Sequence, residues 1–337
     1  MGCGTDHAAA PSPTTTARTR AGPKPVTPTT VTPTTAASLP VPPAALAGCP
    51  PPWHPSVLVP DAALPAPAPP VALSADRAPI EGKGMWVWQM TATERADVDT
   101  IVHRARAAGL RQLWVRVADS RQGFYGASVL DRLVPAAHRA GMAVVGWGFP
   151  YLYDPAADGA WTGQVLGWRA PDGSRLDAFS ADIETETEGT MLSAQRVAVY
   201  LGLARRAAGS RLLVATVFQP TDRLWARYPY AAIAPYVDAF APMVYWGCTE
   251  PGAAATQAIA RLAPMRPVHL IGQAYDMGPE GGRSAAPSAD ETRRFLDVAR
   301  RGGATGASFW VWQHMNTEEW DAMAGFDWAI APPQNQR

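Results

Sequence analysis

The chain has 337 residues, a formal net charge of zero and 17% charged residues. Charge therefore gives no argument for binding nucleic acid or an anionic membrane surface. No run of about 18 apolar residues predicts a transmembrane helix, and the six histidines form no H-x-H or H-E-x-x-H pattern, so we expect neither a metal site nor a cofactor.

The first 80 residues differ in composition from the rest. They contain 19 of the 34 prolines, together with many threonines and alanines and few large apolar side chains. Such a segment buries too little apolar surface to offset its ordering entropy. We therefore predict a disordered tether over residues 1–80 and one folded domain over residues 81–333, a length typical of a single (β/α)8 barrel.

The start of the chain carries a cysteine in a suggestive context. Cys3 is followed by a small, polar, Pro/Thr-rich stretch, and this resembles the region around the lipidated cysteine of bacterial lipoproteins. The resemblance predicts a lipid anchor at Cys3 and an extracellular or cell-surface location, the alternative being an ordinary exposed cysteine. Cys49 and Cys248 would then form a disulfide, which an oxidising exterior permits, or remain as a free thiol in the tether and a buried one in the domain.

From residue 84 onward, short apolar runs alternate with amphipathic stretches, the pattern of a parallel sheet wrapped by helices. Eight runs are expected to be strands: Gly84–Met90, Gln112–Ala118, Met142–Phe149, Ala178–Glu184, Leu212–Phe218, Val237–Tyr245, Pro267–Ala274 and Ala307–Gln313. Three helices are the clearest: Glu94–Ala108, Ser193–Ala208 and Ala289–Arg301, each followed by glycine. No G-x-G-x-x-G follows the first run, which argues against a doubly wound sheet. The predicted fold is thus α/β, a (β/α)8 TIM barrel.

The fourth run ends in closely spaced acids. Asp182 and Glu184 share one face of the expected strand, and Glu186 continues the same parity past its end. Like charges this close raise one another's pKa, as a general acid working near neutral pH requires. These three are the candidate catalytic residues. The alternative is a set of solvated acids, or acids neutralised by Arg116 of the second strand.

Aromatic residues gather near the expected strand ends and suit stacking on sugar rings. The candidates for substrate binding are Trp86, Trp88, Trp147, Tyr245, Trp246, Tyr275, Trp310 and Trp312, with Arg116, Gln219, Met243, Gln273 and Asp276 beside them. For any single aromatic, core packing is an equal alternative. Together they predict a polysaccharide or oligosaccharide ligand for a protein expected to be a monomer.

The order of these strand endings resembles that of the chitinase-like barrels of glycoside hydrolase family 18. That family has a D-x-D-x-E run on strand four, M-x-Y on strand six, a glycine and a tyrosine on strand seven and a tryptophan on strand eight. The corresponding residues are Asp182, Glu184 and Glu186; Met243 and Tyr245; Gly272 and Tyr275; and Trp310 or Trp312. The chain departs from the family pattern at Glu184 and at Trp246, where the family has aspartates.

The resemblance leaves two registers open for the acids. In the family register, Glu186 is the proton donor and Glu184 braces the N-acetyl group of the substrate. If the strand ends one pair earlier, Glu184 is the acid and Asp182 its partner. We favour the second, because Glu186 lies between Thr185 and Thr187 in an expected loop. The implied function is hydrolysis of an extracellular or cell-wall polysaccharide, and the alternative is a catalytically silent, glycan-binding barrel.

Overall fold

The computed structural model describes residues 58–70, 73–74 and 76–329. In this part of the chain, eight parallel strands form a ring that closes because β1 pairs with both β2 and β9. The ring strands are β1 (Gly82–Val87), β2 (Gln112–Asp119), β4 (Ala143–Phe149), β5 (Ala178–Asp182), β6 (Leu212–Phe218), β7 (Ala239–Val244), β8 (His269–Gln273) and β9 (Gly306–Trp310). A two-residue strand, β3 (Gly123–Phe124), pairs antiparallel with β2 beside the ring.

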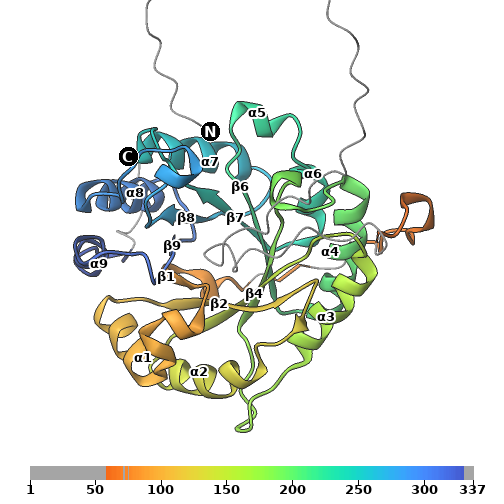
Figure 1. The fold of residues 1–337 in the computed structure, drawn as a ribbon, viewed down its shortest axis with the longest axis horizontal. Helices are drawn as coiled ribbons and strands as arrows, with labels where there is room; N and C mark the ends of the chain where they lie inside the picture. Colours follow the sequence, from red (N-terminus) through yellow and green to blue (C-terminus); the bar gives the residue numbers. More distant parts are fainter. Residues whose placement is uncertain (1–57, 71–72, 75, 330–337) are drawn as a thin grey trace, which may run out of the picture. The chain divides into compact units, whose positions relative to one another are not determined.

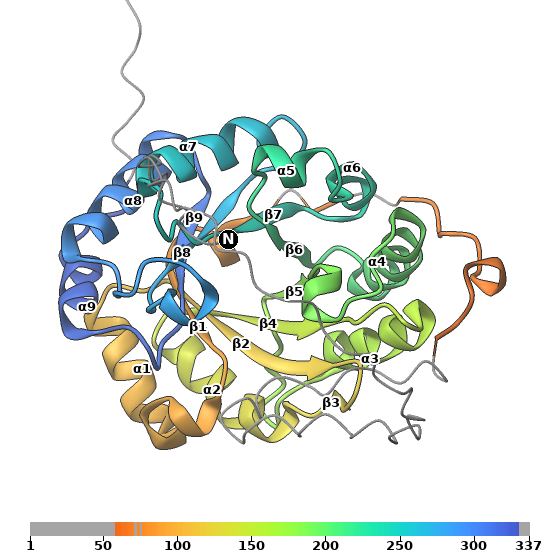
Figure 2. The same ribbon diagram turned by 45° about the horizontal axis from the view of Figure 1, so that its top comes forward.

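Helices surround the ring on its outside (Figures 1 and 2). They are α1 (Val98–Ala107), α2 (Ala127–Arg139), α3 (Pro155–Gly167), α4 (Ala194–Ala208), α5 (Asp222–Trp225), α6 (Tyr230–Ile233), α7 (Pro251–Leu262), α8 (Ala289–Arg301) and α9 (Thr317–Ala324). All eight apolar runs of the sequence form ring strands, so the predicted (β/α)8 barrel is confirmed. Among the described residues, none of the helices is long and apolar enough to cross a membrane.

Local capping explains where the helices start. α8 begins with a reciprocal cap in which the Ser288 hydroxyl accepts from the Glu291 amide and the Glu291 carboxylate accepts from the Ser288 amide. This helix has the predicted bounds. α1 does not begin at Glu94 as expected but at Val98, because the Asp97 side chain caps it by accepting from the Thr100 amide.

Two apolar clusters divide the core by strand parity. On β5, Phe179 and Ala181 point outward and pack with the helices, and Ile183 just beyond the strand continues that face. The inner cluster fills the ring and is rich in tryptophan: Trp86 stacks on Trp114 with ring centroids 4.9 Å apart. Interiors of such barrels are packed cores, so residues at the carboxyl ends of the strands are the ones within reach of a ligand.

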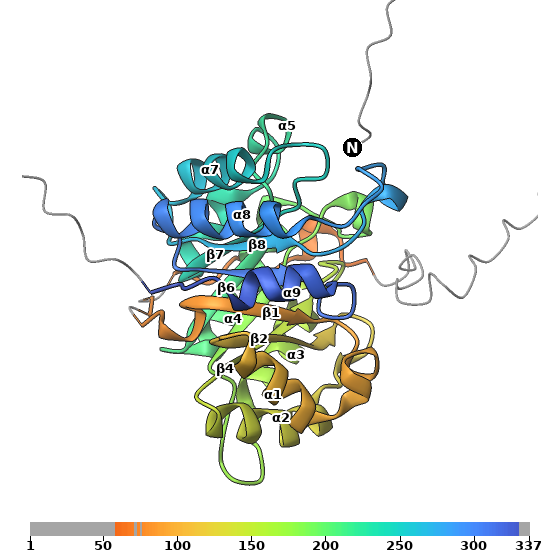
Figure 3. The same ribbon diagram turned by 90° about the vertical axis from the view of Figure 1, so that its left-hand side faces the viewer.

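The carboxyl ends of the ring strands form what we call the mouth. Figure 3 shows the barrel from the side, with the arrow of β2 pointing to the right, toward the mouth. The loops that follow β5 and β8 project from this same end. Residues at strand ends and in these loops are therefore the candidates for function.

Part of the expected tether lies against the barrel. The Val59 amide donates to the Tyr153 carbonyl at 2.9 Å, and Arg196 of α4 donates to the Val59 carbonyl and pairs with Asp61 at 2.6 Å (Figure 1, orange). The expected boundary at residue 80 therefore falls after a segment that already contacts the barrel. Residues 1–57 lie outside the described part.

Candidate active site

β5 carries Asp182 and Glu184 into the inside of the ring. Ser180, on the same face, shares a 2.8 Å hydrogen bond with Thr216 of β6 inside the barrel. The Ile183 amide donates to the Thr216 carbonyl at 3.0 Å, so strand pairing continues one residue past β5. Strand alternation consequently reaches Glu184 and gives it the inward direction of Asp182.

Asp182 is buried and Glu184 is partly buried, and each carboxyl group has a buried oxygen without a hydrogen-bond partner. Asp182 is 6% exposed, and its Oδ1 atom has no hydrogen-bond partner; the buried Oε2 atom of Glu184 has none either. Burial raises the pKa of Asp182 to about 7. Burial, followed by the charge of Asp182, raises the pKa of Glu184 well above its ordinary value. The raised pKa favours the protonated form of Glu184, the form that a general acid needs.

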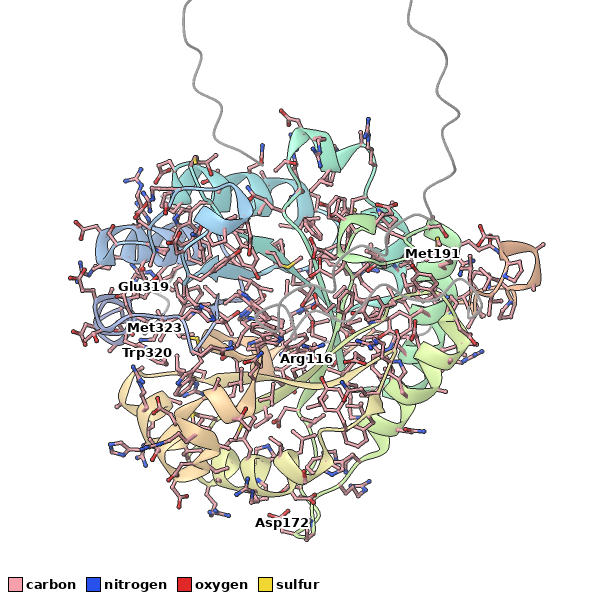
Figure 4. The ribbon with its side chains drawn as sticks, viewed as in Figure 1. Arg116, Asp172, Met191, Glu319, Trp320 and Met323 are labelled. Atoms are coloured by element: carbon pink, nitrogen blue, oxygen red, sulfur yellow. The ribbon has the colours of Figure 1, made fainter. Side chains whose placement is uncertain are left out.

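Arg116 of β2 supplies the positive charge that acts on Asp182. Figure 4 shows Arg116 in the middle of the ring of helices, whereas Asp172 lies on a peripheral loop. The guanidinium lies 5.5 Å from the ring centroid of Trp147 and donates to Asp119 at 3.3 Å. It lowers the pKa of Asp182, but burial has the larger, opposite effect. Arg116 thus lies beside the acids without forming an ion pair with either of them.

Glu186 does not join the pair. It begins the 3-10 helix η7 (Glu186–Glu188) and is exposed. Of the two registers that the sequence left open, the geometry matches the one in which the strand ends one pair earlier, with Asp182 and Glu184 inside the ring. The loop residues after Thr185 turn Glu186 away because η7 breaks the strand alternation.

Two further acids act on the site from the loops. Glu188 of η7 and Glu280 of the 3-10 helix η9 (Gly278–Glu280) both raise the pKa of Glu184. Tyr275 donates its hydroxyl to Oε2 of Glu280 at 2.9 Å. Sequence reasoning missed Glu280 because its loop follows β8, and only ring closure brings this loop to β5. We call Asp182, Glu184, Glu188 and Glu280 the mouth acids.

Tryptophans occupy the ring below and beside the acids. Trp86, Trp147 and Trp310 lie within 5.4 to 5.8 Å of one another by ring centroid, and Trp88 lies 6.0 Å from Trp310. Trp88 and Trp310 are only partly buried, so they are the members a ligand can reach. The fifth inner tryptophan, Trp114, was not singled out from the sequence, although it has the parity of Arg116.

Two expected mouth tryptophans lie elsewhere. Trp246 packs in the outer cluster with its ring 5.2 Å from Phe295. Trp312 also lies in the outer cluster, packs on Trp320 at 4.8 Å and donates to Glu94 at 3.1 Å. Trp246 has the parity opposite to Tyr245, so strand alternation itself directs it outward. Trp312 has the parity of Trp310 but lies two residues past the end of β9, where the alternation no longer holds. Of Trp310 and Trp312, only Trp310 is inside the ring.

Tyr245 and Met243 lie inside the ring at the end of β7. The rings of Tyr245 and Tyr275 meet edge to face with centroids 5.6 Å apart. Burial, then Tyr275 and the acids, raises the pKa of Tyr245 well above its ordinary value, so its phenol keeps its proton. A neutral phenol beside the acids is a hydrogen-bond donor for a sugar oxygen.

The expected polar residues mostly bind protein groups. Gln273 is buried, accepts from the Gly247 amide at 2.9 Å and donates to the Tyr275 carbonyl at 2.8 Å, so it joins the loops after β7 and β8. Asp276 is exposed and accepts from the Gly278 amide. Gln219 is partly exposed directly after β6. Among the described residues, the side chains of Gln273 and Asp276 thus hold loops by hydrogen bonds, whereas that of Gln219 does not.

Tyr228 is a positioning residue that the sequence did not reveal. Its buried hydroxyl donates to the Ile183 carbonyl at 2.6 Å. This bond holds the peptide between Asp182 and Glu184. The glycine of the strand-seven resemblance also has a packing role, since a Cβ on Gly272 would lie 2.7 Å from Phe295 and 2.8 Å from Phe309.

The described residues contain no group of three or more His, Cys, Asp or Glu arranged to hold a metal ion. Cys248 is exposed, lies four residues after the end of β7, and is disulfide-bonded. Cys3 and Cys49 lie outside the described residues, so the Cys49–Cys248 pairing and lipidation of Cys3 stay predictions.

No family model matches the sequence, and no curated protein sequence matches it. Solved structures do share the fold. They include a family GH18 chitinase from Cycas revoluta in complex with allosamidin (TM-score 0.52, 12% identity, covering 72% of this chain and 98% of that one). The spore cortex-lytic enzyme SleL of Bacillus megaterium has a TM-score of 0.53 at 11% identity, with 73% and 74% covered. An endo-1,4-beta-mannanase from Rhizomucor miehei has 0.54 at 8% identity, with 74% and 90% covered.

The chain is thus a (β/α)8 barrel with the fold of glycoside hydrolases and with a buried acid pair at its mouth. Family 18 chitinases are among the proteins that share this fold, in agreement with the resemblance of the strand endings.

Proposed function

We propose that the protein hydrolyses glycosidic bonds of a polysaccharide, with Glu184 as the general acid and Asp182 as its partner. The observation that carries the proposal is the acid pair itself, in which burial raises both pKa values and the charge of Asp182 raises that of Glu184 further. A carboxylic acid that keeps its proton near neutral pH can protonate the leaving oxygen of a glycoside. The glycoside hydrolase fold of the structural neighbours supports the same reaction class.

The surrounding residues have roles that follow from their positions. Trp310 and Trp88 offer partly exposed ring faces on which a sugar can stack. Tyr245 donates a hydrogen bond from its neutral phenol, and Arg116 favours the charged form of Asp182. Tyr228 keeps the peptide between the two acids in place.

Replacing Glu184 by glutamine tests the proposal, because the amide keeps the shape of the side chain and cannot donate the proton. We expect the rate of release of reducing ends from a panel of polysaccharides to fall by about 10²–10⁴-fold. Glu186→Gln is the matched control, since Glu186 is two residues away and exposed, and its rate should remain near wild type. Loss of activity in Glu186→Gln with retention in Glu184→Gln would reverse the assignment.

The alternative function is glycan binding without hydrolysis. The chain has Glu184 and Trp246 where family 18 has aspartates, and these two departures favour the alternative. Binding of the polysaccharide panel with no release of reducing ends by the wild-type chain would select it.

The proposal includes a location outside the cell, with a lipid anchor at Cys3. The disulfide at Cys248 supports an oxidising compartment. The protein expressed in bacteria with a lipoprotein signal peptide joined ahead of Cys3 should partition into detergent, and Cys3→Ala should move it into the aqueous phase. Equal partitioning of both would remove the anchor from the proposal.

A further inference from the structure

The mouth acids approach the site from two loops. Glu188 lies in η7, four residues after Glu184, and Glu280 lies in η9 after β8. The hydrogen bond from Tyr275 to Glu280 and the edge-to-face contact of Tyr275 with Tyr245 connect Glu280 to the inside of the ring. Two carboxylates from loops far apart in the sequence therefore lie at one opening.

The negative charge of this opening is not balanced within the described part of the barrel. No ion pair formed by the described residues includes a mouth acid. Arg116, the cation that acts on Asp182, is bonded to Asp119 instead. Elsewhere in the same barrel, buried acids have bonded partners, as Asp238 has in Arg205 and Asp158 has in three donors.

Two buried polar groups beside the opening also lack partners. Asp182, 6% exposed, has its free Oδ1 atom, and Trp147, 2% exposed, has a free indole N–H inside the ring. Trp147 of β4 pairs in register with Ser180 of β5, and Ser180 lies two residues before Asp182 on the same face of β5. A buried polar group without a hydrogen-bond partner destabilises the fold, and a bound ligand can supply the missing partner.

Resting on the proposed function, we infer that the glycan carries free amino groups, and that a protonated amino sugar binds between Glu188 and Glu280. Neutral hydroxyl groups would leave the repulsion between Glu188 and Glu280 in place. An ammonium group offers three donors and a positive charge, and so forms charge-assisted hydrogen bonds while relieving that repulsion. Among sugars, the amino sugar without its acetyl group is the chemical class that supplies this cation. The substrate is then a partly de-N-acetylated hexosamine polymer, with the amine in a subsite beside the reacting bond.

Calorimetric titration of the full chain with matched oligosaccharides tests this inference. The probes are short oligomers of β-1,4-glucosamine and α-1,4-galactosamine, each compared with its fully N-acetylated form. We expect at least one amine oligomer to bind about tenfold or more tighter than its acetylated form, and this ratio to fall with added salt. The Glu188→Gln/Glu280→Gln variant should bring the ratio close to one.

Glu81→Gln is the control, because Glu81 is exposed and immediately precedes β1, at the end of the barrel opposite the mouth. It should keep the wild-type ratio. Equal or tighter binding of both acetylated oligomers by the wild type, or an unchanged ratio in the double variant, would overturn the inference. Cleavage assays distinguish this inference from the proposed function. Preferred binding of the amine oligomers without cleavage would remove the hydrolytic function and keep the inference. Cleavage of the acetylated oligomers alone would keep the hydrolytic function and remove the inference.

Discussion

The two ends of the barrel each bury a carboxylate, but they surround it differently. Beside the amino end of β7, Asp238 accepts from Arg205 at 2.7 Å, from the Leu213 amide at 2.7 Å and from the Ser74 amide at 2.6 Å. At the mouth, Asp182 is equally enclosed, yet its Oδ1 atom has no partner. A buried charge with all its donors holds elements together, whereas one without them destabilises the fold.

This difference indicates a structural role for the carboxylate at the amino end and a chemical role for the carboxyl pair at the mouth. The amino end uses charge to join α4, β6 and β7. The mouth has a carboxyl pair whose pKa values are raised, as a general acid requires. The hydrogen bonding of this pair is also incomplete. If the comparison is right, substitutions at the two ends should change stability with opposite signs.

The largest effect is expected for Arg205→Ala. It removes the partner of Asp238 and the donors to the Gly209 and Arg211 carbonyls, and leaves a charge buried without compensation. The free energy of unfolding, measured in urea, should fall by about 3–5 kcal/mol. Arg293→Ala, which breaks an exposed pair with Asp290, should change it by less than about 0.5 kcal/mol. Equal losses in both variants would contradict the role of the Arg205 pair.

A smaller change of opposite sign is expected for Asp182→Asn. The folded pKa of about 7 lies above the ordinary value of 3.8, so the folded state holds the proton more tightly and loses stability as pH rises between these values. The amide avoids this loss. Asp182→Asn should therefore be more stable than wild type by about 1–3 kcal/mol above pH 7, and the gain should shrink toward pH 4.

Asp158→Asn is the matched comparison for that measurement. Burial raises the pKa of Asp158 to about 7 as well, but its oxygens accept from Ser120, Trp161 and the Leu152 amide. An amide cannot accept at both positions, so this variant should be less stable than wild type. Stabilisation by Asp158→Asn, or none by Asp182→Asn, would end the distinction between the two kinds of buried acid.

The smallest effect concerns the segment before the barrel. A chain that begins at residue 76 loses the Val59–Tyr153 bond, the Arg196 contacts and the Ser74 bond to Asp238, whereas one that begins at residue 58 keeps them. We expect the shorter chain to be less stable by about 1–2 kcal/mol, seen as a lower Tm. The same Tm for both would show that the segment adds nothing to the barrel.

The sequence predicted the barrel and the acid pair because both depend on local pattern. Strand alternation is enough to direct Asp182 and Glu184 inward. It fails past the strand ends, where it would have placed Trp312 in the mouth. Glu280 could not be found this way, since its place beside Glu184 depends on ring closure and on its bond with Tyr275. Contacts of the segment around Val59 likewise depend on tertiary packing that low apolar content does not reveal.

The most direct test of the account is a carboxyl titration at the mouth, followed by NMR with ¹³C-labelled aspartate and glutamate side chains. The account predicts that Asp182 titrates near about 7 and Glu184 above its ordinary range, and that Asp182→Asn lowers the midpoint of Glu184 by removing the neighbouring charge. Titration of both carboxyl groups near about 4, as in unperturbed acids, would contradict it.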